Sequence, residues 1–378
     1  IIMLPFVRMF NYGNTVAAPT GIKDFQANGS HCMALTYSGE MWAYGTSTSG
    51  SMGTGFTVGA ADKGWYKSNI SNVKSFSSNM QTSTVALTND DRVLVCGSTR
   101  FDKFSTPDIA SSNLDWLDVT DHIPQEVIDA GMKQVINHAY YVAIFTENNL
   151  LYSVALSLGN TSTIIDRTWR RNTFGDIQVE RVVSLTQTPS GPLCIVQDAD
   201  GYQYGIGYNG NKIIDNTSTN SYSVYTKMGT LPYNEFAISN SGKFSSAVLS
   251  DGRSVYSGTF PKSFNDSFGS FLKVGAVSNT VFGLDAKNMR GQYGQNQLPI
   301  ASADNNASNG VVNLRNVPAG TQTKDIRFIC GNDVKNVYII YTNEDGISSF
   351  YGLGPNFDQN STAYAQFVKV DLPGALLN

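Results

Sequence analysis

Histidine, the side chain most often used for acid–base catalysis, occurs at only three positions in this chain of 378 residues. His31, His122 and His138 lie 91 and 16 residues apart, so no two of them form a metal-binding pair on one short element. The G-x-S-x-G motif of hydrolases is absent, and no Cys–His arrangement typical of a thiol nucleophile can be argued. His31 stands at a position that belongs to the internal repeat described below, and at such a position a packed structural histidine is favoured over a catalytic one. We therefore predict no catalytic residues and no enzymatic activity, unless residues from separate parts of the chain meet in the fold.

Two short motifs resemble ligand-binding loops. Gly205, Gly207 and Gly210 match the G-x-G-x-x-G pattern, but the residues that follow, 211–216, are too polar and turn-like to open the helix that a dinucleotide site needs. Asp198-x-Asp200-Gly201 begins like a calcium loop but lacks the further acidic ligands and the closing glutamate. A hairpin turn is the better interpretation of this second motif. We predict neither a cofactor nor a bound metal.

Charge and cysteine usage narrow the class of protein further. The net charge is −4, and only 15% of the residues are charged, so a basic nucleic-acid-binding surface is not expected. The four cysteines are widely separated and lie in or beside apolar strands, which predicts buried reduced thiols and a non-oxidising compartment for folding. No apolar run approaches the length of a membrane-spanning helix, so no membrane insertion is expected.

Aromatic and arginine side chains in the polar connecting segments are the best candidates for binding a partner, because Trp, Tyr and Arg dominate interface hot spots. For Trp65 and Trp116 an alternative is favoured, namely that each begins the outermost strand of a repeat unit and covers its core. For Trp169 and Tyr222 the two interpretations are more evenly balanced. The predicted partner-binding residues are Trp169, Arg170, Arg171, Tyr222, Tyr225, Trp65 and Trp116.

The elements that must position these residues come from an internal repeat. Seven times, a short apolar strand runs into a polar turn and out into a second strand, with spacings of 52, 57, 51, 53, 35 and 56 residues between equivalent positions. A period near fifty with several strands per unit is typical of a β-propeller, in which each blade covers its neighbour's apolar face. We expect an all-β, seven-bladed propeller with units centred on Ala34, Ala86, Ala143, Cys194, Ala247, Phe282 and Tyr338.

Turn chemistry agrees with this repeat. Pairs such as Asp200-Gly201 and Asp251-Gly252 fall between the two strands, and these residue types tolerate the positive φ of tight hairpins. A glycine recurs after the second strand and predicts a kink or a close backbone approach near the centre of the ring. These glycines are Gly45, Gly97, Gly207, Gly258 and Gly352.

The first unit resembles the repeat of the regulator-of-chromosome-condensation family of seven-bladed propellers, and weaker similarity extends over about residues 22–372. Unit six keeps the tail of that pattern in residues 288–294. The resemblance implies a ring whose faces bind different partners in different members, which include an exchange factor, a photoreceptor and an enzyme inhibitor. The clustered tryptophans of the photoreceptor are absent. The matching residues of the first unit are His31, Ala34, Leu35, Thr36, Gly39, Gly45, Gly50, Met52 and Gly53.

The two ends of the chain share an apolar-apolar-basic-apolar pattern, at 6–9 and at 367–370. A ring must join its first and last blades, and an unpaired edge strand invites aggregation. We therefore expect residues 1–378 to form one domain, with residues 1–21 as an arm that helps to close the ring. In this arrangement Leu4–Phe10 would pair with the final unit, Ile326–Leu372.

The predicted function is that of a non-enzymatic interaction protein. Low charge, a bias toward Asn, Ser, Thr, Gly and Tyr, and divergent repeats favour an accessory component of a bacteriophage capsid or tail. Its partners would then be other virion proteins, and its location the virion. Two alternatives stay open: an adhesin that binds a cell-surface glycan or receptor, and a cytoplasmic propeller that acts as exchange factor or enzyme inhibitor.

Overall fold

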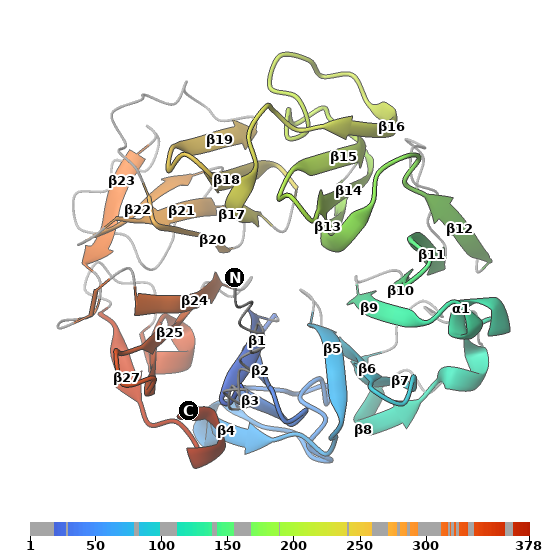
Figure 1. Cartoon of the computed structure of the whole chain (residues 1–378). Coiled ribbons are helices and arrows are strands. Elements are labelled where there is room, and N and C mark those ends of the chain that lie inside the picture. The colour runs from blue at the N-terminus through green and yellow to red at the C-terminus, as the bar shows by residue number, and fades with distance from the viewer. Residues whose placement is uncertain are drawn as a thin grey trace, which may run out of the picture.

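The computed structural model places antiparallel sheets around a ring (Figure 1). It describes residues 19–378 except 28, 79–82, 99–111, 138–141, 155–167, 189, 240–241, 259–270, 278–279, 286–287, 294–310, 317, 319–320, 323–324, 332–335 and 360–365. We number the sheets in chain order. The first strand of each sheet faces the centre of the ring, and the last faces outward (Figure 1). The prediction of an all-β propeller is confirmed.

The strands follow one another within each sheet. Sheet 1 contains β1 (Ile22–Ala27), β2 (His31–Thr36), β3 (Met41–Gly45) and β4 (Gly64–Lys67). Sheet 2 contains β5 (Val73–Ser78), β6 (Ser83–Thr88), β7 (Val93–Ser98) and β8 (Ser112–Asp118). Sheet 3 contains β9 (Met132–Asn137), β10 (Val142–Thr146), β11 (Leu150–Val154) and β12 (Trp169–Thr173). Sheet 4 contains β13 (Val179–Thr188), β14 (Gly191–Asp198), β15 (Gln203–Gly207) and β16 (Tyr222–Lys227).

The remaining sheets complete the ring. Sheet 5 contains β17 (Tyr233–Ile238), β18 (Phe244–Leu249) and β19 (Ser254–Gly258). Sheet 6 contains β20 (Lys273–Val277), β21 (Thr280–Leu284), β22 (Asn288–Tyr293) and β23 (Val311–Asn316). Sheet 7 contains β24 (Ile326–Gly331), β25 (Val337–Thr342), β26 (Ser348–Leu353) and β27 (Val368–Val370). Four short helices lie between strands of the described chain: η1 (Ala60–Asp62), η2 (Thr120–His122), α1 (Gln125–Asp129) and η5 (Pro355–Phe357); η6 (Gly374–Leu376) follows β27.

The expectation of seven blades needs correction. Six sheets of the described chain are complete four-stranded blades, and the fifth has three strands. Its unit is followed by the shortest interval of the repeat, so only residues 259–272 separate β19 from β20. The repeat centres themselves are right, because all of them fall in the second strand of a sheet.

Apolar clusters lie between the sheets, and each combines side chains from two neighbours. Between sheets 2 and 3, for example, Val85 and Val95 pack with Val135 and Ile144. A sheet whose two faces are both apolar can be buried only by neighbours on both sides, which the ring provides.

The recurrent glycines do allow a close backbone approach. This approach lies at the end of the third strand, opposite the hairpin turn, and not at the ring's centre. Gly207 ends β15 with φ +102°, and a side-chain carbon there would lie 2.1 Å from the Pro192 carbonyl oxygen of the neighbouring strand. Gly258 ends β19 with φ +138° and approaches the Lys243 carbonyl in the same way. Only glycine fits such positions.

The ring closes where sheet 7 meets sheet 1. The Phe350 ring contacts Tyr44 and Trp65 of sheet 1, with centroids 5.1 and 4.9 Å away. Asn356 donates a hydrogen bond from its side-chain amide to the Ser30 carbonyl (2.8 Å). The fourth strand of sheet 7 is β27, so the C-terminal segment supplies it. The predicted pairing of Leu4–Phe10 lies outside the described residues, and the role of residues 1–21 stays a prediction.

Replacing Phe350 by alanine should lower the free energy of unfolding by about 3–5 kcal/mol, because a fully buried ring that joins both ends of the chain leaves a cavity. Chemical unfolding of the purified protein measures this loss. Ile347→Ala, at an exposed position of the same hairpin, is the control and should change stability by less than about 0.5 kcal/mol. Equal effects of the two substitutions would contradict a closure held by this cluster.

Candidate functional site

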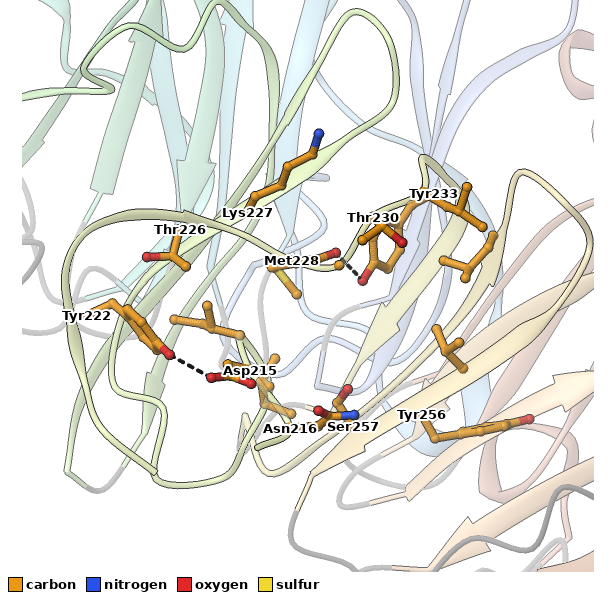
Figure 2. A pocket seen from close by; sticks show the side chains of 16 residues that line it. Asp215, Asn216, Tyr222, Thr226, Lys227, Met228, Thr230, Tyr233, Tyr256 and Ser257 are labelled. Atoms are coloured by element: carbon orange, nitrogen blue, oxygen red, sulfur yellow. Dashed lines mark hydrogen bonds between the residues drawn. The ribbon is translucent and has the colours of Figure 1, made fainter. Parts of the chain in front are cut away.

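A groove of about 410 Å³ lies between sheets 4 and 5 (Figure 2). One wall comes from the segment around β16 and the loop before it, and the other comes from β18 and β19. Among the described residues that line it, the charged side chains are Asp215 and Lys227. The lining residues are Ile213, Ile214, Asp215, Asn216, Tyr222, Thr226, Lys227, Met228, Gly229, Thr230, Leu231, Tyr233, Leu249, Val255, Tyr256 and Ser257.

The buried Asn209 side chain holds the loop that forms the floor of this groove. Its amide nitrogen donates to the carbonyls of Asp215 (3.1 Å) and Ser218 (2.8 Å). Its oxygen accepts from the backbone N–H groups of Ile214 (2.8 Å) and Asp215 (3.3 Å). The loop contains no helix or strand, so its backbone N–H and C=O groups bond to this side chain in place of a neighbouring strand.

Asp215 and Tyr222 are the polar pair that this loop presents. The Tyr222 hydroxyl donates to Asp215 Oδ2 (2.8 Å), while Oδ1 accepts from the backbone N–H (2.9 Å) and the hydroxyl (2.7 Å) of Thr217. These donors, the Thr217 N–H first, lower the pKa of Asp215, and the same pair raises the pKa of Tyr222. The carboxylate is therefore charged at neutral pH and fixed in orientation.

The opposite end of the groove is more apolar. The Tyr233 hydroxyl donates to the Met228 carbonyl (2.8 Å), and burial raises the pKa of Tyr233. The Lys227 ammonium lies over the Tyr202 ring, 3.4 Å from its centroid, and points away from Asp215 in Figure 2. Asp215 is thus the charge that faces the groove.

The predicted partner-binding residues lie on the outermost strands of four successive sheets, so the fold does not gather them into one site. Trp65, on β4, packs against Phe350 at the ring seam. Trp116, on β8, is half-buried and donates from Nε1 to Ser68 Oγ (2.8 Å). These placements agree with the alternative that both tryptophans cover the core.

The other candidates divide by exposure. On β12, Trp169 and Arg170 are half-buried and Arg171 is exposed. On β16, Tyr225 packs between sheets 3 and 4, and its hydroxyl lies 3.5 Å from Cys194 Sγ. Tyr222 alone lines the groove. A partner-binding role for these residues stays a prediction.

Sequence reasoning missed Asn209 and Asp215. The available signal was weak: both lie in the polar connector that begins at residue 209, and an Asx residue two positions before Thr217 can form an Asx-turn. The same connector contains no helix, so the G-x-G-x-x-G match at 205–210 lacks the context of a dinucleotide site.

The remaining residues with possible chemistry are dispersed. His31 is fully buried at the start of β2, which agrees with its predicted structural role, and His122 is exposed in η2. His138 lies outside the described residues. All four cysteines are free: three are buried, and Cys330 is half-buried. The described part of the chain contains no metal-binding group of three or more His, Cys, Asp or Glu side chains, and none of its helices could span a membrane.

Solved structures show what this fold resembles. The crystal structure of human WBSCR16 matches with a TM-score of 0.62 at 12% identity, over 89% of this chain and 96% of that chain. The structure of Prp20p from Saccharomyces cerevisiae, described with its binding properties to Gsp1p and histones, matches with a TM-score of 0.50 at 12% identity, over 92% of this chain and 76% of that one. At such identities the likeness shows the propeller fold alone. No family model and no curated protein sequence matches.

Asn209→Ala should lower the free energy of unfolding by about 1–3 kcal/mol, because it leaves the buried Ile214 N–H without its acceptor. Hydrogen exchange of residues 213–218 should also become faster. Urea unfolding and exchange mass spectrometry measure the two effects. Asn216→Ala, at an exposed position of the same loop, is the control; matched exchange rates in the two variants would contradict the role of Asn209.

His31 should make stability depend on pH. Burial lowers its pKa from 6.5 to about 4, so between these values the unfolded chain binds the proton and the folded chain does not. The contribution of His31 to the free energy of unfolding is therefore fully present above pH 6.5, and about 3 kcal/mol of it is lost as the pH drops to 4. In His31→Gln this part of the pH dependence should disappear from urea unfolding curves. An unaltered pH profile would show that His31 does not titrate in this way.

Proposed function

We propose that this chain is a non-enzymatic binding propeller that holds a protein partner in the groove between sheets 4 and 5. The observation that carries the proposal is the Asp215–Tyr222 pair, fixed by the buried Asn209 and facing an open groove. A site whose side chains are already held in place loses less conformational entropy when it binds a partner.

The chemistry of the lining supports binding over catalysis. The described residues that line the groove include no histidine and no cysteine. Its carboxylate accepts three hydrogen bonds from the chain itself, which lower its pKa and make it a poor proton acceptor. The phenols of Tyr222 and Tyr233 are each bonded to an internal acceptor. These are features of a recognition surface.

A protein is the partner class favoured by the likeness to Prp20p, whose structure is described with its binding properties to Gsp1p and histones. The phage-particle component, a receptor-binding adhesin, and the exchange factor or inhibitor are specific forms of this proposal, whereas a glycan-binding adhesin would be a different function. They differ in the identity of the partner, so identifying that partner separates them.

Affinity capture tests the proposal. The immobilised protein is exposed to a lysate or particle preparation from its source, and bound proteins are quantified by mass spectrometry. Tyr222→Ala should reduce a stoichiometric partner at least about tenfold, the effect of a modest hot spot. Tyr37→Ala, an exposed aromatic on sheet 1, is the matched control and should leave the partner bound. Equal recovery on wild type and Tyr222→Ala would reject the groove as the binding site.

A further inference from the structure

The carboxylate of Asp215 has one bonding position that the described residues do not use. Its Oδ1 accepts two hydrogen bonds from Thr217, one from the backbone N–H (2.9 Å) and one from the hydroxyl (2.7 Å). Its Oδ2 accepts one, from the Tyr222 hydroxyl (2.8 Å). A carboxylate has about four lone-pair positions, two on each oxygen, so one position on Oδ2 is left for a ligand.

Asp118 shows what occupies this position elsewhere in the chain. It forms the same local turn, because its Oδ1 accepts from the N–H (2.9 Å) and the hydroxyl (2.5 Å) of Thr120, two residues later. Its Oδ2, however, accepts from two nitrogens of Arg92, Nε (2.9 Å) and Nη2 (2.6 Å). In this instance a cation completes the carboxylate of the turn.

No cation of the described residues completes Asp215 in this way. None of the ion pairs among them includes Asp215. The ammonium of Lys227 lies over the Tyr202 ring. The N–H and the hydroxyl of Thr217, together with the Tyr222 hydroxyl, lower the pKa of Asp215, so its carboxylate is charged at neutral pH. The described lining therefore presents a fixed negative charge without an internal counter-charge.

The open position selects among the cations that could fill it. A metal ion would need several ligands, and the described residues contain no group of three or more His, Cys, Asp or Glu side chains that could hold one. A guanidinium gains its advantage from two parallel bonds to a carboxylate, but Asp215 has a single position left. An ammonium is a compact charge for which one acceptor is enough. Lysine is therefore the basic side chain that fits best.

The remainder of the groove suits the aliphatic stem of a lysine. In Figure 2 Asp215 and Tyr222 lie toward one end of the groove, and Tyr233 lies toward the other. Leu231 and Val255 are half-buried apolar residues of the same lining. Lysine stems pack on apolar surface of this kind while the ammonium reaches a polar group.

We propose that the partner protein places a lysine side chain in this groove, with its ammonium bound to Asp215 Oδ2 and its stem along the apolar lining. This proposal rests on the function proposed above and names the feature of the partner that the groove recognises. Charge complementarity of this kind rejects partners with a neutral or acidic residue at the same place. Acetylation of that lysine removes the charge and should weaken the complex.

Two synthetic peptides test the charge. Both have an acetylated N-terminus, an amidated C-terminus and one central lysine flanked by leucine and serine, and in the second peptide the lysine side chain is acetylated. The capped ends leave the lysine as the only cation. Wild type should bind the first peptide about three- to fivefold more tightly than the second in calorimetric titrations, the effect of an exposed ion pair.

Matched variants assign this preference to one carboxylate. Asp215→Asn keeps an oxygen that can accept from Thr217 but loses the charge, so the two peptides should bind it equally. Asp251→Asn is the control, because Asp251 also accepts from a backbone N–H two residues later, that of Arg253 (3.1 Å), but already pairs with the Arg253 guanidinium (2.6 Å). This variant should keep the wild-type preference.

Three results would overturn the proposal: no binding of the lysine peptide to wild type, a preference that survives in Asp215→Asn, or tighter binding of a peptide with arginine in place of lysine. Affinity capture separates these failures from failure of the proposed function. A captured partner that is lost on Tyr222→Ala but retained on Asp215→Asn would leave the groove's function standing and reject only the recognition of lysine.

Discussion

The structure depends on the fact that each sheet is apolar on both faces. Val85 and Val95 of sheet 2, for instance, face sheet 3, while Ala86 and Leu94 of the same strands face sheet 1. No single sheet could keep both faces out of water, so every sheet needs two neighbours and the series must close on itself. The seam between sheets 7 and 1 buries apolar side chains as the other interfaces do, although the residues that form it lie at opposite ends of the chain.

Packing between sheets constrains the residues of the inner strands in every blade. The outer strands and the loops that follow them are less constrained, so the structure of one blade can differ from the next there. Sheet 5 differs most. The side chains of Ile213 and Ile214, from a loop of sheet 4, fill the space against it, and Asn209 holds that loop in place. The groove is lined by this loop together with the strands of both sheets.

The fixed Asp215–Tyr222 pair and the half-buried strand β19 line the same groove. A carboxylate with an imposed orientation can select one part of a ligand. The tryptophans on other outer strands, such as Trp65 and Trp116, serve the packing of the ring.

The sequence by itself determined the all-β class, the repeat and its centres, since apolar alternation and turn residues act over a few positions. Residues such as Ala34 and Cys194 could be aligned because each sheet solves the same local packing problem. Only the tertiary structure decided which connector residues meet. Asn209 and Asp215 become a site through bonds to the backbone of a loop that packs between sheets 4 and 5. This property has no local signature, because it depends on what a neighbouring segment does in space.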